Sequence, residues 1–352
     1  MLHSAGLVHA LDGNAKRNYD QMRSDNKSSL NPASAKPGSS QSLQWGDCYV
    51  IIAGPTASGK SELALALAER ADGVIINADS IQLYADLHLL TARPDNKSMQ
   101  RAPHHLYGVI DGAERASVAT WLTMAAEAIA TARAANKLPI IIGGTGMYIN
   151  AGLVGLAPIP EVPVDIHAAC GARLEKIGGE AFRAELANFD LVTARRLSAS
   201  DSQRLIRAMG VVKATDRPLS EWQADPHLGK FAGTALTISL MPPRAMLYDR
   251  INRRFDEMLT AGVIEEVAQL ASRGLDAGLP VMKALGVREL LAFLEGEINL
   301  ESAAELTKRD TRHYAKRQMT WLRNNFNPKI FINEQLSERL SEKIFSNLIK
   351  KY

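Results

Sequence analysis

The chain has 352 residues, of which 46% are hydrophobic and 22% are charged, and its formal net charge is +3. These values are ordinary for a globular protein. The net charge is too small to indicate a nucleic-acid partner by itself, so a nucleic-acid surface would have to come from local clusters of basic residues. Cys48 and Cys170 are the two cysteines and form no CxxC pair, so we expect a reducing compartment and no zinc site. No apolar run approaches the roughly 18 residues typical of a membrane span. We therefore expect a monomer of the cytoplasm that does not enter a membrane.

The first segment of the chain, residues 1–46, differs from the rest in composition. It is rich in Ser, Asn, Lys and Gly, as in "RSDNKSSLNPASAKPGSSQS", and has no sustained hydrophobic period. This pattern predicts a disordered N-terminal extension. Two alternatives stay open, namely a transit peptide, which the aspartates of this segment disfavour, and a start codon further along, such as Met22.

Apolar strands alternate with helical patterns from residue 48 onward. Strands are predicted at 48–54, 73–79 and 138–144, and helices at 59–71 and 117–137. Strands that are apolar throughout are typical of a parallel sheet covered on both faces, which places the chain in the α/β class.

A glycine-rich turn follows the first of these strands. "GPTASGKS", from Gly54 to Ser61, fits the pattern G-x-x-x-x-G-K-[ST] between a strand and a helix. In this pattern the backbone amides and the helix N-terminus face phosphate oxygens, Lys60 reaches a terminal phosphate, and the Ser61 hydroxyl can ligate magnesium. The residues expected to bind phosphate are Gly54, Pro55, Thr56, Ala57, Ser58, Gly59, Lys60 and Ser61. A surface turn without a ligand is the alternative.

The sequence after this loop divides the chain further. A proline-rich break at 158–163 precedes helical patterns up to about residue 233, a strand is predicted at 234–243, and the rest is predominantly helical from Leu247. We therefore predict a P-loop NTPase-like parallel core at 47–160 and 234–332, a helical insertion domain at 161–233, a helical C-terminal region, and a C-terminal helix or tail at 333–352.

Asp79 is the first carboxylate at a predicted strand end, in "NADSIQLY", because the strand "LPIII" ends in "GGTGMY" without an acid. A carboxylate there could accept a proton from a nucleophile near the phosphates. It could equally cap a helix, since Asp79 and Ser80 both suit an N-cap. The residues alone leave these two interpretations open.

Two further turns offer polar side chains near strand ends. Gly143, Gly144 and Thr145 could flank the ligand crevice that doubly wound sheets form at strand C-termini, or make a plain turn. The neighbouring His104 and His105 do not share a helix face, so a structural or proton-sharing role is favoured over a metal site.

The stretch 308–326, "KRDTRHYAKRQMTWLRNNF", is predicted to be an amphipathic helix with a basic ridge. Arg309, Arg312, Lys316 and Arg323 gather on one stripe, beside an apolar stripe of Ala315, Met319, Leu322 and Phe326. "QRLIRAM", at 203–209, adds two further arginines. These stretches could contact a nucleic-acid backbone, with rings of the helix stacking on bases, or could be ordinary solvated faces.

Together these motifs resemble the tRNA dimethylallyltransferase (tRNA isopentenyltransferase) family. The matching stretches are "GPTASGKS", "DSIQLY", "PHHLYGVID", "GGTGMYINAGLVGL", "DSQRLIRA", "RINRRFDEML", "KALGVREL" and "KRQMTWLRN", which follow the family's order from residue 54 to 324. The resemblance implies transfer of a dimethylallyl group from dimethylallyl diphosphate to the exocyclic amine of the adenosine 3′-adjacent to the anticodon in tRNA, with release of diphosphate and assistance by Mg²⁺.

The resemblance also implies roles for individual residues. Asp79 matches the general base, Arg254 an arginine that neutralises the departing diphosphate, and Ser61 the hydroxyl that meets diphosphate or magnesium. Thr145 completes the catalytic set, near the incoming adenosine. The tRNA-contact segments correspond to Asp79, Ser80, Ile81, Gln82, Thr145, His167, Gln203, Arg204, Leu205, Ile206, Arg207, Lys283, Ala284, Leu285, Gly286, Val287, Arg288, Lys316, Arg317, Gln318, Met319, Thr320, Trp321, Leu322 and Arg323.

The chain departs from the family pattern at a few positions. Leu90 and Arg93 differ from the usual Gly-Thr-Ala-Lys-Pro pattern, Val287 stands at a usual tyrosine, and His167 stands where some members carry arginine. These departures put tRNA affinity or selectivity in doubt, not the chemistry. Three alternatives to the tRNA enzyme were weighed: a small-molecule kinase of the P-loop class, a prenyltransferase acting on free adenine nucleotides, and an RNA-binding P-loop protein without catalysis.

Overall fold

The computed structural model describes residues 45–334, 337, 340–342 and 344–346. The predicted N-terminal extension, 1–46, lies outside the described residues except for its last two. Of the predicted C-terminal segment, 340–342 and 344–346 are helical, and much of the remainder lies outside the described residues. The described part divides into two compact units, one made of the chain up to Leu153 and from Phe231 onward, the other of Val154–Lys230.

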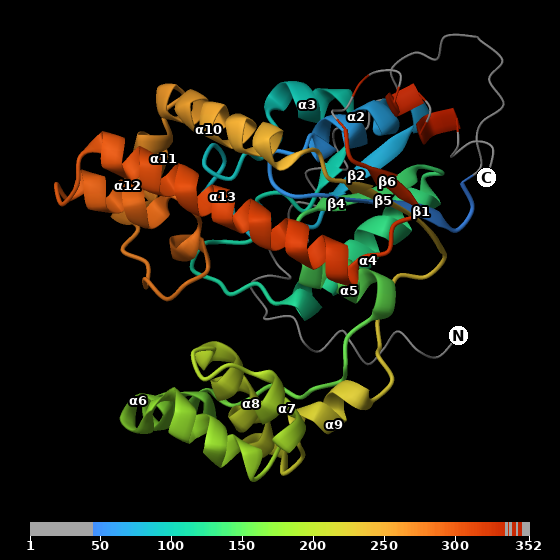
Figure 1. Ribbon diagram of the computed structural model, residues 1–352. Helices are drawn as coiled ribbons and strands as arrows, with labels where there is room; N and C mark the ends of the chain where they lie inside the picture. The colour runs from blue at the N-terminus through green and yellow to red at the C-terminus, as the bar shows by residue number, and fades with distance from the viewer. Residues whose placement is uncertain (1–44, 335–336, 338–339, 343, 347–352) are drawn as a thin grey trace, which may run out of the picture. The chain divides into compact units, whose positions relative to one another are not determined.

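A six-stranded parallel sheet forms the centre of the first unit (Figure 1), in the order β3-β2-β4-β1-β5-β6. The strands are β1 (Cys48–Ala53), β2 (Gly73–Asn77), β3 (His104–His105), β4 (Leu138–Gly143), β5 (Thr234–Leu240) and β6 (Ile330–Ile332). Every residue of β1, β2 and β4 is buried, because helices cover both faces of a parallel sheet. The predicted α/β class and parallel core are thereby confirmed.

Helices pack on the two faces of this sheet and beside it. α2 (Lys60–Ala71) and α3 (Asn96–Arg101) lie on one side of the sheet, and α4 (Val118–Ala134) and α5 (Gly146–Val154) on the other (Figure 1). Leu63 and Leu67 of α2 pack on Val50, Ile140 and Ile238 of the strands. This packing fixes where α2 begins, and so fixes the turn that joins it to β1.

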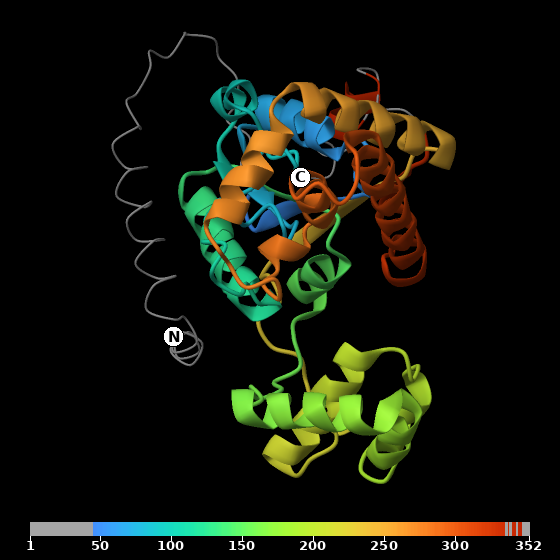
Figure 2. The ribbon, with the colours of Figure 1, turned by 90° about the vertical axis from the view of Figure 1, so that its left-hand side faces the viewer.

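A second group of helices follows β5. It consists of α10 (Arg244–Thr260), α11 (Val263–Ser272), the 3₁₀ turn η2 (Val281–Lys283), α12 (Val287–Leu294) and the long α13 (Leu300–Asn325). α11 and α12 face the viewer in Figure 2. The predicted apolar stripe of α13 is buried, since Ala315, Met319, Leu322 and Phe326 are each at most 7% exposed. Among the helices of the described residues, none is both long and apolar enough to cross a bilayer.

Two short strands were missed by the sequence patterns. β3 has two residues and β6 three, too few to show a period of two. β6 interrupts the region from Leu247 that was predicted to be predominantly helical, and it pairs with Ile238–Leu240 of β5.

The second unit is helical. It contains α6 (Val164–Ala187), interrupted at Gly178, and α7 (Leu191–Arg196), α8 (Ser202–Thr215) and α9 (Leu219–Ala224). Phe182, Leu186 and Leu205, all fully buried, lie in its core. The predicted bounds of the insertion were 161–233, whereas the compact unit spans 154–230, because the chain on both sides of the helices, near Leu156 and Leu228, pairs within this unit.

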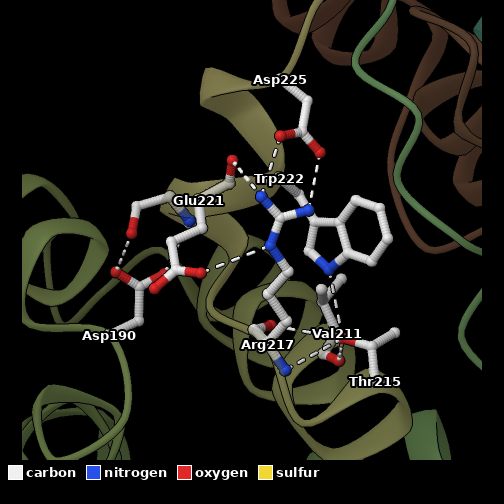
Figure 3. A network of polar contacts seen from close by, with 8 residues as sticks. Asp190, Val211, Thr215, Arg217, Glu221, Trp222 and Asp225 are labelled. Atoms are coloured by element: carbon white, nitrogen blue, oxygen red, sulfur yellow. Dashed lines mark hydrogen bonds and ion pairs between the residues drawn. The ribbon is translucent and has the colours of Figure 1, made fainter.

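Polar side chains fasten α7, α8 and α9 together (Figure 3). Asp190 is 2% exposed and accepts four hydrogen bonds, from the backbone N–H and hydroxyl of Thr193 at 2.9 and 2.7 Å and from those of Ser220 at 2.9 and 2.7 Å. Arg217 bridges to both oxygens of Asp225 at 2.6 and 2.8 Å and lies over the ring of Trp222. These hydrogen bonds and the ion pair therefore fix the conformation of the loops between the helices.

Replacing Asp190 by Ala should destabilise the insertion by about 3 kcal/mol, because two buried donors of Thr193 and two half-buried donors of Ser220 lose a charged acceptor. Burial raises the pKa of Asp190, but its hydrogen bonds outweigh burial and hold the pKa below its ordinary value. The stabilisation from this residue is therefore present above the ordinary carboxyl pKa and is lost as pH falls through the lowered one. Denaturant unfolding with helix-resolved hydrogen exchange measures the effect; the exposed Asp165→Ala is the control, and equal unfolding of the two variants would contradict the prediction.

Candidate active site at the phosphate loop

The residues of the predicted phosphate loop connect β1 to α2. A Cβ on Gly54 would lie 2.6 Å from the carbonyl oxygen of Leu240, so only glycine fits. Gly59 has φ of 94° and Ala57 has φ of 62°, both in the left-handed region that turns the chain sharply before the helix. The Lys60 ammonium reaches back to the carbonyl of Pro55 at 3.4 Å.

Two arginines of α10 contact this loop from one side. Arg254 Nη2 donates to Thr56 Oγ1 at 2.8 Å, and Arg250 Nη1 lies 3.4 and 3.3 Å from the carbonyl oxygens of Ala57 and Ser58. Arg250 and Arg254 are four residues apart and so share one helix face. Arg254 was expected at this site from the sequence and Arg250 was not, although the four-residue spacing indicates that both lie on one helix face.

Gln318 of α13 holds the loop from another side. Its Oε1 accepts from the N–H of Thr56 at 2.8 Å, and its Nε2 donates to the carbonyl of Gly144 at 3.0 Å, while the side chain is 5% exposed. A Cβ on Gly144 would lie 2.1 Å from Gln318 Nε2, and one on Gly146 would lie 2.3 Å from the Trp321 ring. The glycines of "GGTG" therefore let α13 approach the sheet closely.

Asp79 follows β2 and is partly exposed at the carboxyl end of the sheet. Its backbone N–H donates to Asn77 Oδ1 at 2.8 Å, and its own Oδ1 accepts from the N–H of Ile81 at 3.1 Å. The residues directly after Asp79 and Ser80 form turns and bends, and the next helix is α3 at Asn96–Arg101, so the N-cap interpretation is wrong and the carboxylate instead closes a short turn. Thr145 Oγ1 accepts from the N–H of Ser80 at 3.1 Å, which joins the "GGTG" turn to the Asp79 turn.

Charges converge where these turns meet. Burial lowers the pKa of Lys60 to about 8, against the attraction of Asp79 and with some repulsion from Arg254. Burial likewise lowers the pKa of Arg254, and Asp79 opposes it. Two cations and one carboxylate, each half-buried, thus lie close enough to influence one another, and an anion would be favoured beside the cations.

Tyrosines also lie near Asp79: Tyr107 and Tyr148 were not expected there from the sequence, whereas Tyr314 is one of the rings of the predicted helix at 308–326. Burial and the nearby charge of Asp79 raise the pKa values of Tyr107, Tyr148 and Tyr314. They therefore remain neutral phenols around Asp79. Tyr107 and Tyr148 stand singly in two separate motifs, so no local sequence pattern indicated that they lie near Asp79.

The side chains at the loop fit a magnesium ion that is held mainly by substrate phosphate oxygens and water. The Ser61 hydroxyl is exposed at the start of α2. Within the described residues, no group of three or more His, Cys, Asp or Glu side chains could hold a metal, which leaves His104 and His105 outside any such cluster. Mg²⁺ retains water and takes substrate phosphate oxygens readily, so one hydroxyl together with phosphate is a sufficient protein contribution. The buried Ser58 hydroxyl, without a hydrogen-bond partner in the described part of the chain, is a further group that could face phosphate oxygens.

The basic ridge of α13 is only partly free. Arg309 pairs with Asp310 at 2.9 Å, and Arg312 donates to Asn252 at 2.7 Å. Lys316, Arg317 and Arg323 are exposed and make no ion pair within the described residues. A hollow of about 540 Å³ runs along this part of the helix, lined by His313, Lys316, Arg317, Thr320, Trp321, Asn324 and Asn325. The free positive charge therefore lies on the last three turns.

Several side chains of the expected tRNA-contact segments point inward. Leu205, Ala284, Gly286, Val287, Gln318, Met319 and Leu322 are buried. The expected contact of these segments with tRNA stays a prediction, and at these buried positions it would have to come from the backbone or from exposed neighbouring residues. Leu285 and Ile206 are half-buried, and Lys283, Arg288, Thr320 and Arg323 are exposed.

The expected contacts in the insertion lie within the second unit. His167, Gln203 and Arg204 are exposed, and Arg204 pairs with Asp201 at 2.9 Å. Arg207 is half-buried and lies 3.4 Å from the Pro160 carbonyl. These residues form their own surface on α6 and α8.

A parallel sheet with this phosphate loop after its first strand defines an α/β protein of the P-loop class. A family model described as "IPP transferase" matches residues 82–325, and one described as "Isopentenyl transferase" matches 47–107. The chain belongs to the tRNA dimethylallyltransferase family, and so is a prenyl-transferring enzyme.

Individual relatives agree with this assignment. The chain is 47% identical to a tRNA dimethylallyltransferase of Rhodospirillum rubrum over 88% of this chain and 93% of that one, and 48% identical to one of Parvibaculum lavamentivorans over 84% and 94%. The crystal structure of a tRNA isopentenylpyrophosphate transferase of Bacillus halodurans is 32% identical, with a TM-score of 0.63 over 87% of this chain and 97% of that one. A eukaryotic dimethylallyltransferase acting on tRNA is 25% identical, with a TM-score of 0.72 over 86% and 80%.

Replacing Gln318 by Met should lower the stability of the core by about 1–3 kcal/mol, because the Thr56 N–H and the Gly144 carbonyl lose their buried partner. Hydrogen exchange of residues 54–58 should accelerate as well. The control is Lys316→Met on the same helix, which removes an exposed side chain. Unaltered melting and exchange in Gln318→Met would show that the two hydrogen bonds contribute nothing to the loop.

Proposed function

We propose that this protein transfers a dimethylallyl group from dimethylallyl diphosphate to the exocyclic amine of the adenosine 3′-adjacent to the anticodon in tRNA, releasing diphosphate. The observation that carries the proposal is that Arg254 binds the phosphate loop through Thr56, while Thr145 joins the "GGTG" turn to the Asp79 turn at the same carboxyl end of the sheet. Relatives with this activity in their names span nearly the whole chain.

In this proposal the loop residues hold the diphosphate. The backbone amides at the N-terminus of α2, the Lys60 ammonium and the Arg254 guanidinium face its oxygens. As the bond between the allylic carbon and the diphosphate oxygen breaks, its electron pair goes to the diphosphate, and pre-placed cations favour that charge. Mg²⁺, held by Ser61 and phosphate oxygens, would supply further positive charge to the leaving group.

The carboxylate of Asp79 takes the other half of the reaction. The adenosine amine nitrogen forms a bond to the allylic carbon, and its proton goes to Asp79. Thr145, bonded to the N–H of Ser80, keeps the "GGTG" turn beside this carboxylate. The target base must leave the stack of the anticodon loop to reach Asp79, at a cost of a few kcal/mol.

The rest of the chain binds the tRNA body in this proposal. The exposed cations of α13, Lys316, Arg317 and Arg323, contact phosphates, and the insertion contributes its surface at His167 and Gln203–Arg207. The core of 47–160 and 234–332 acts as the catalytic domain, and 161–233 as a tRNA-binding domain. The exposed cations of α13 and the presence of the helical insertion disfavour an enzyme acting on free adenine nucleotides.

One assay tests the proposal. The protein is incubated with dimethylallyl diphosphate labelled in its prenyl group, Mg²⁺ and unmodified tRNA, and the tRNA is digested to locate the label. We expect label in the anticodon loop, with equimolar diphosphate released. In parallel incubations, label on AMP with none on tRNA, or turnover that needs ATP in place of the prenyl donor, would establish one of the alternative enzymes instead.

Replacing Asp79 by Asn should lower turnover by about 100-fold or more, because the amide cannot accept the proton. The amide oxygen can still accept from Ile81, so the turn and tRNA binding should persist. Single-turnover rates and tRNA binding are measured in parallel. Asp95→Asn, an exposed helix cap, is the control, and wild-type rates in Asp79→Asn would remove this residue as the base.

Replacing Lys316 and Arg317 together by Ala should weaken tRNA binding and reduce the steepness of its salt dependence by about two phosphate contacts. The matched control is Arg309→Ala, because that guanidinium is already paired with Asp310. Binding titrations across a range of salt concentrations give the slopes. A slope like that of the wild type would place the RNA surface elsewhere.

A further inference from the structure

A carboxylate that lies outside the proposed reaction centre binds a turn of the chain that neighbours this centre. Glu266 of α11 accepts hydrogen bonds from three consecutive backbone N–H groups, those of His88 at 2.6 Å, Leu89 at 2.8 Å and Leu90 at 2.9 Å. Convergent amides of this kind form an anion-binding concavity, and here the anion is a side chain of the same protein. Hydrogen bonds to a carboxylate are roughly twice as strong as neutral ones.

The turn that Glu266 holds is connected to the Asp79 segment. Gln82 Nε2 donates to the carbonyls of Thr91 at 2.8 Å and Ala92 at 3.1 Å, directly after the three bound amides. Gln82 also lies one residue beyond Ile81, whose N–H binds the Asp79 carboxylate. The position of the turn therefore sets the position of Gln82 beside Asp79.

α11 fastens the same segment at a second point. Arg273 pairs with Asp86 and with Asp111, the latter at 2.7 Å, and Asp86 also accepts from the N–H of Gly112 at 2.8 Å. The segment 86–90 is thus bound by Glu266 of α11 and by Arg273, which directly follows this helix. Glu266 is the contact that lies nearer to the carbonyls bound by Gln82.

Apolar packing alone does not specify this arrangement. Leu89 and Leu90 are half-buried against the cluster that contains Phe255, Val267 and Leu290. Hydrophobic contact is non-directional, so it keeps these side chains near the helices without fixing the orientation of their backbone. The three amides are oriented by the carboxylate, while Ala92, with φ of 53°, completes the turn in the left-handed region.

We infer that Glu266 is a positioning residue for the prenyl transfer: through residues 88–92 and Gln82 it holds the Asp79 turn in the geometry that meets the nucleobase. The inference rests on the proposed function. Glu266 makes no hydrogen bond to the phosphate loop within the described part of the chain, so its effect belongs to the nucleobase half of the site. The diphosphate half should be independent of it.

The test compares Glu266→Gln with Glu265→Gln in steady-state kinetics with both substrates. Glutamine has one acceptor oxygen, so at least one of the three amides loses its partner. We expect kcat to fall about 10-fold in Glu266→Gln while KM for dimethylallyl diphosphate stays within about twofold of wild type. Glu265 is exposed on the same turn of α11, and Glu265→Gln removes the same charge as Glu266→Gln. The Glu265→Gln variant should therefore behave as wild type.

Hydrogen exchange supplies a second readout on the same proteins. Amides of 86–93 should exchange faster in Glu266→Gln, and amides of 54–61 should not. An unchanged kcat in Glu266→Gln overturns the inference. An equal loss of kcat/KM for both substrates together with a lowered melting temperature overturns it as well, because it indicates a merely structural role. If the wild type itself places no label in tRNA, the proposed function has failed, and the two failures are thereby distinguished.

Discussion

The buried amide of Gln318 is the contact on which the arrangement of the site depends. It joins three segments that are far apart in the sequence: the phosphate loop through Thr56, the "GGTG" turn through Gly144, and the helix α13. A buried donor or acceptor left unpaired costs about 1–3 kcal/mol, so α13 cannot shift away from the loop cheaply. Arg254 on α10 binds the hydroxyl of the same Thr56 and fixes the loop from a second helix.

This arrangement puts two functions on opposite sides of one helix. The buried side of α13 supports the loop that we propose holds diphosphate, and its exposed side carries Lys316 and Arg317. The placement of the cations that would receive the leaving charge is therefore tied to the helix that would receive the RNA. In such a site the catalytic groups are set before substrate arrives, which is the condition under which fixed charges lower a barrier most.

Local patterns sufficed for the parts of this protein that local patterns determine. A short stretch of sequence is enough to predict each of the phosphate loop, the strands β1, β2, β4 and β5, and the amphipathic helix α13. β3 and β6 have too few residues to do so. The role of Gln318 could not be read because its partner Thr56 lies 262 residues away, and a glutamine in a basic stretch looks like a surface residue. Whether Asp79 capped a helix depended on what the chain did next, which only the structure supplied.

The connections of the helical insertion have a consequence for the core. The N–H of Phe231 donates to the carbonyl of Gly152 at 2.8 Å, and Leu156 and Leu228 exchange a pair of backbone hydrogen bonds at 2.8 Å. The chain thus leaves the core and returns to it at neighbouring residues, and it enters and leaves the insertion in the same way. Because both ends meet, the entropy of closing this long excursion grows only slowly with its length. The sheet therefore keeps the same connection at Gly152 and Phe231 whatever the length of the chain between them, and the insertion packs around its own core.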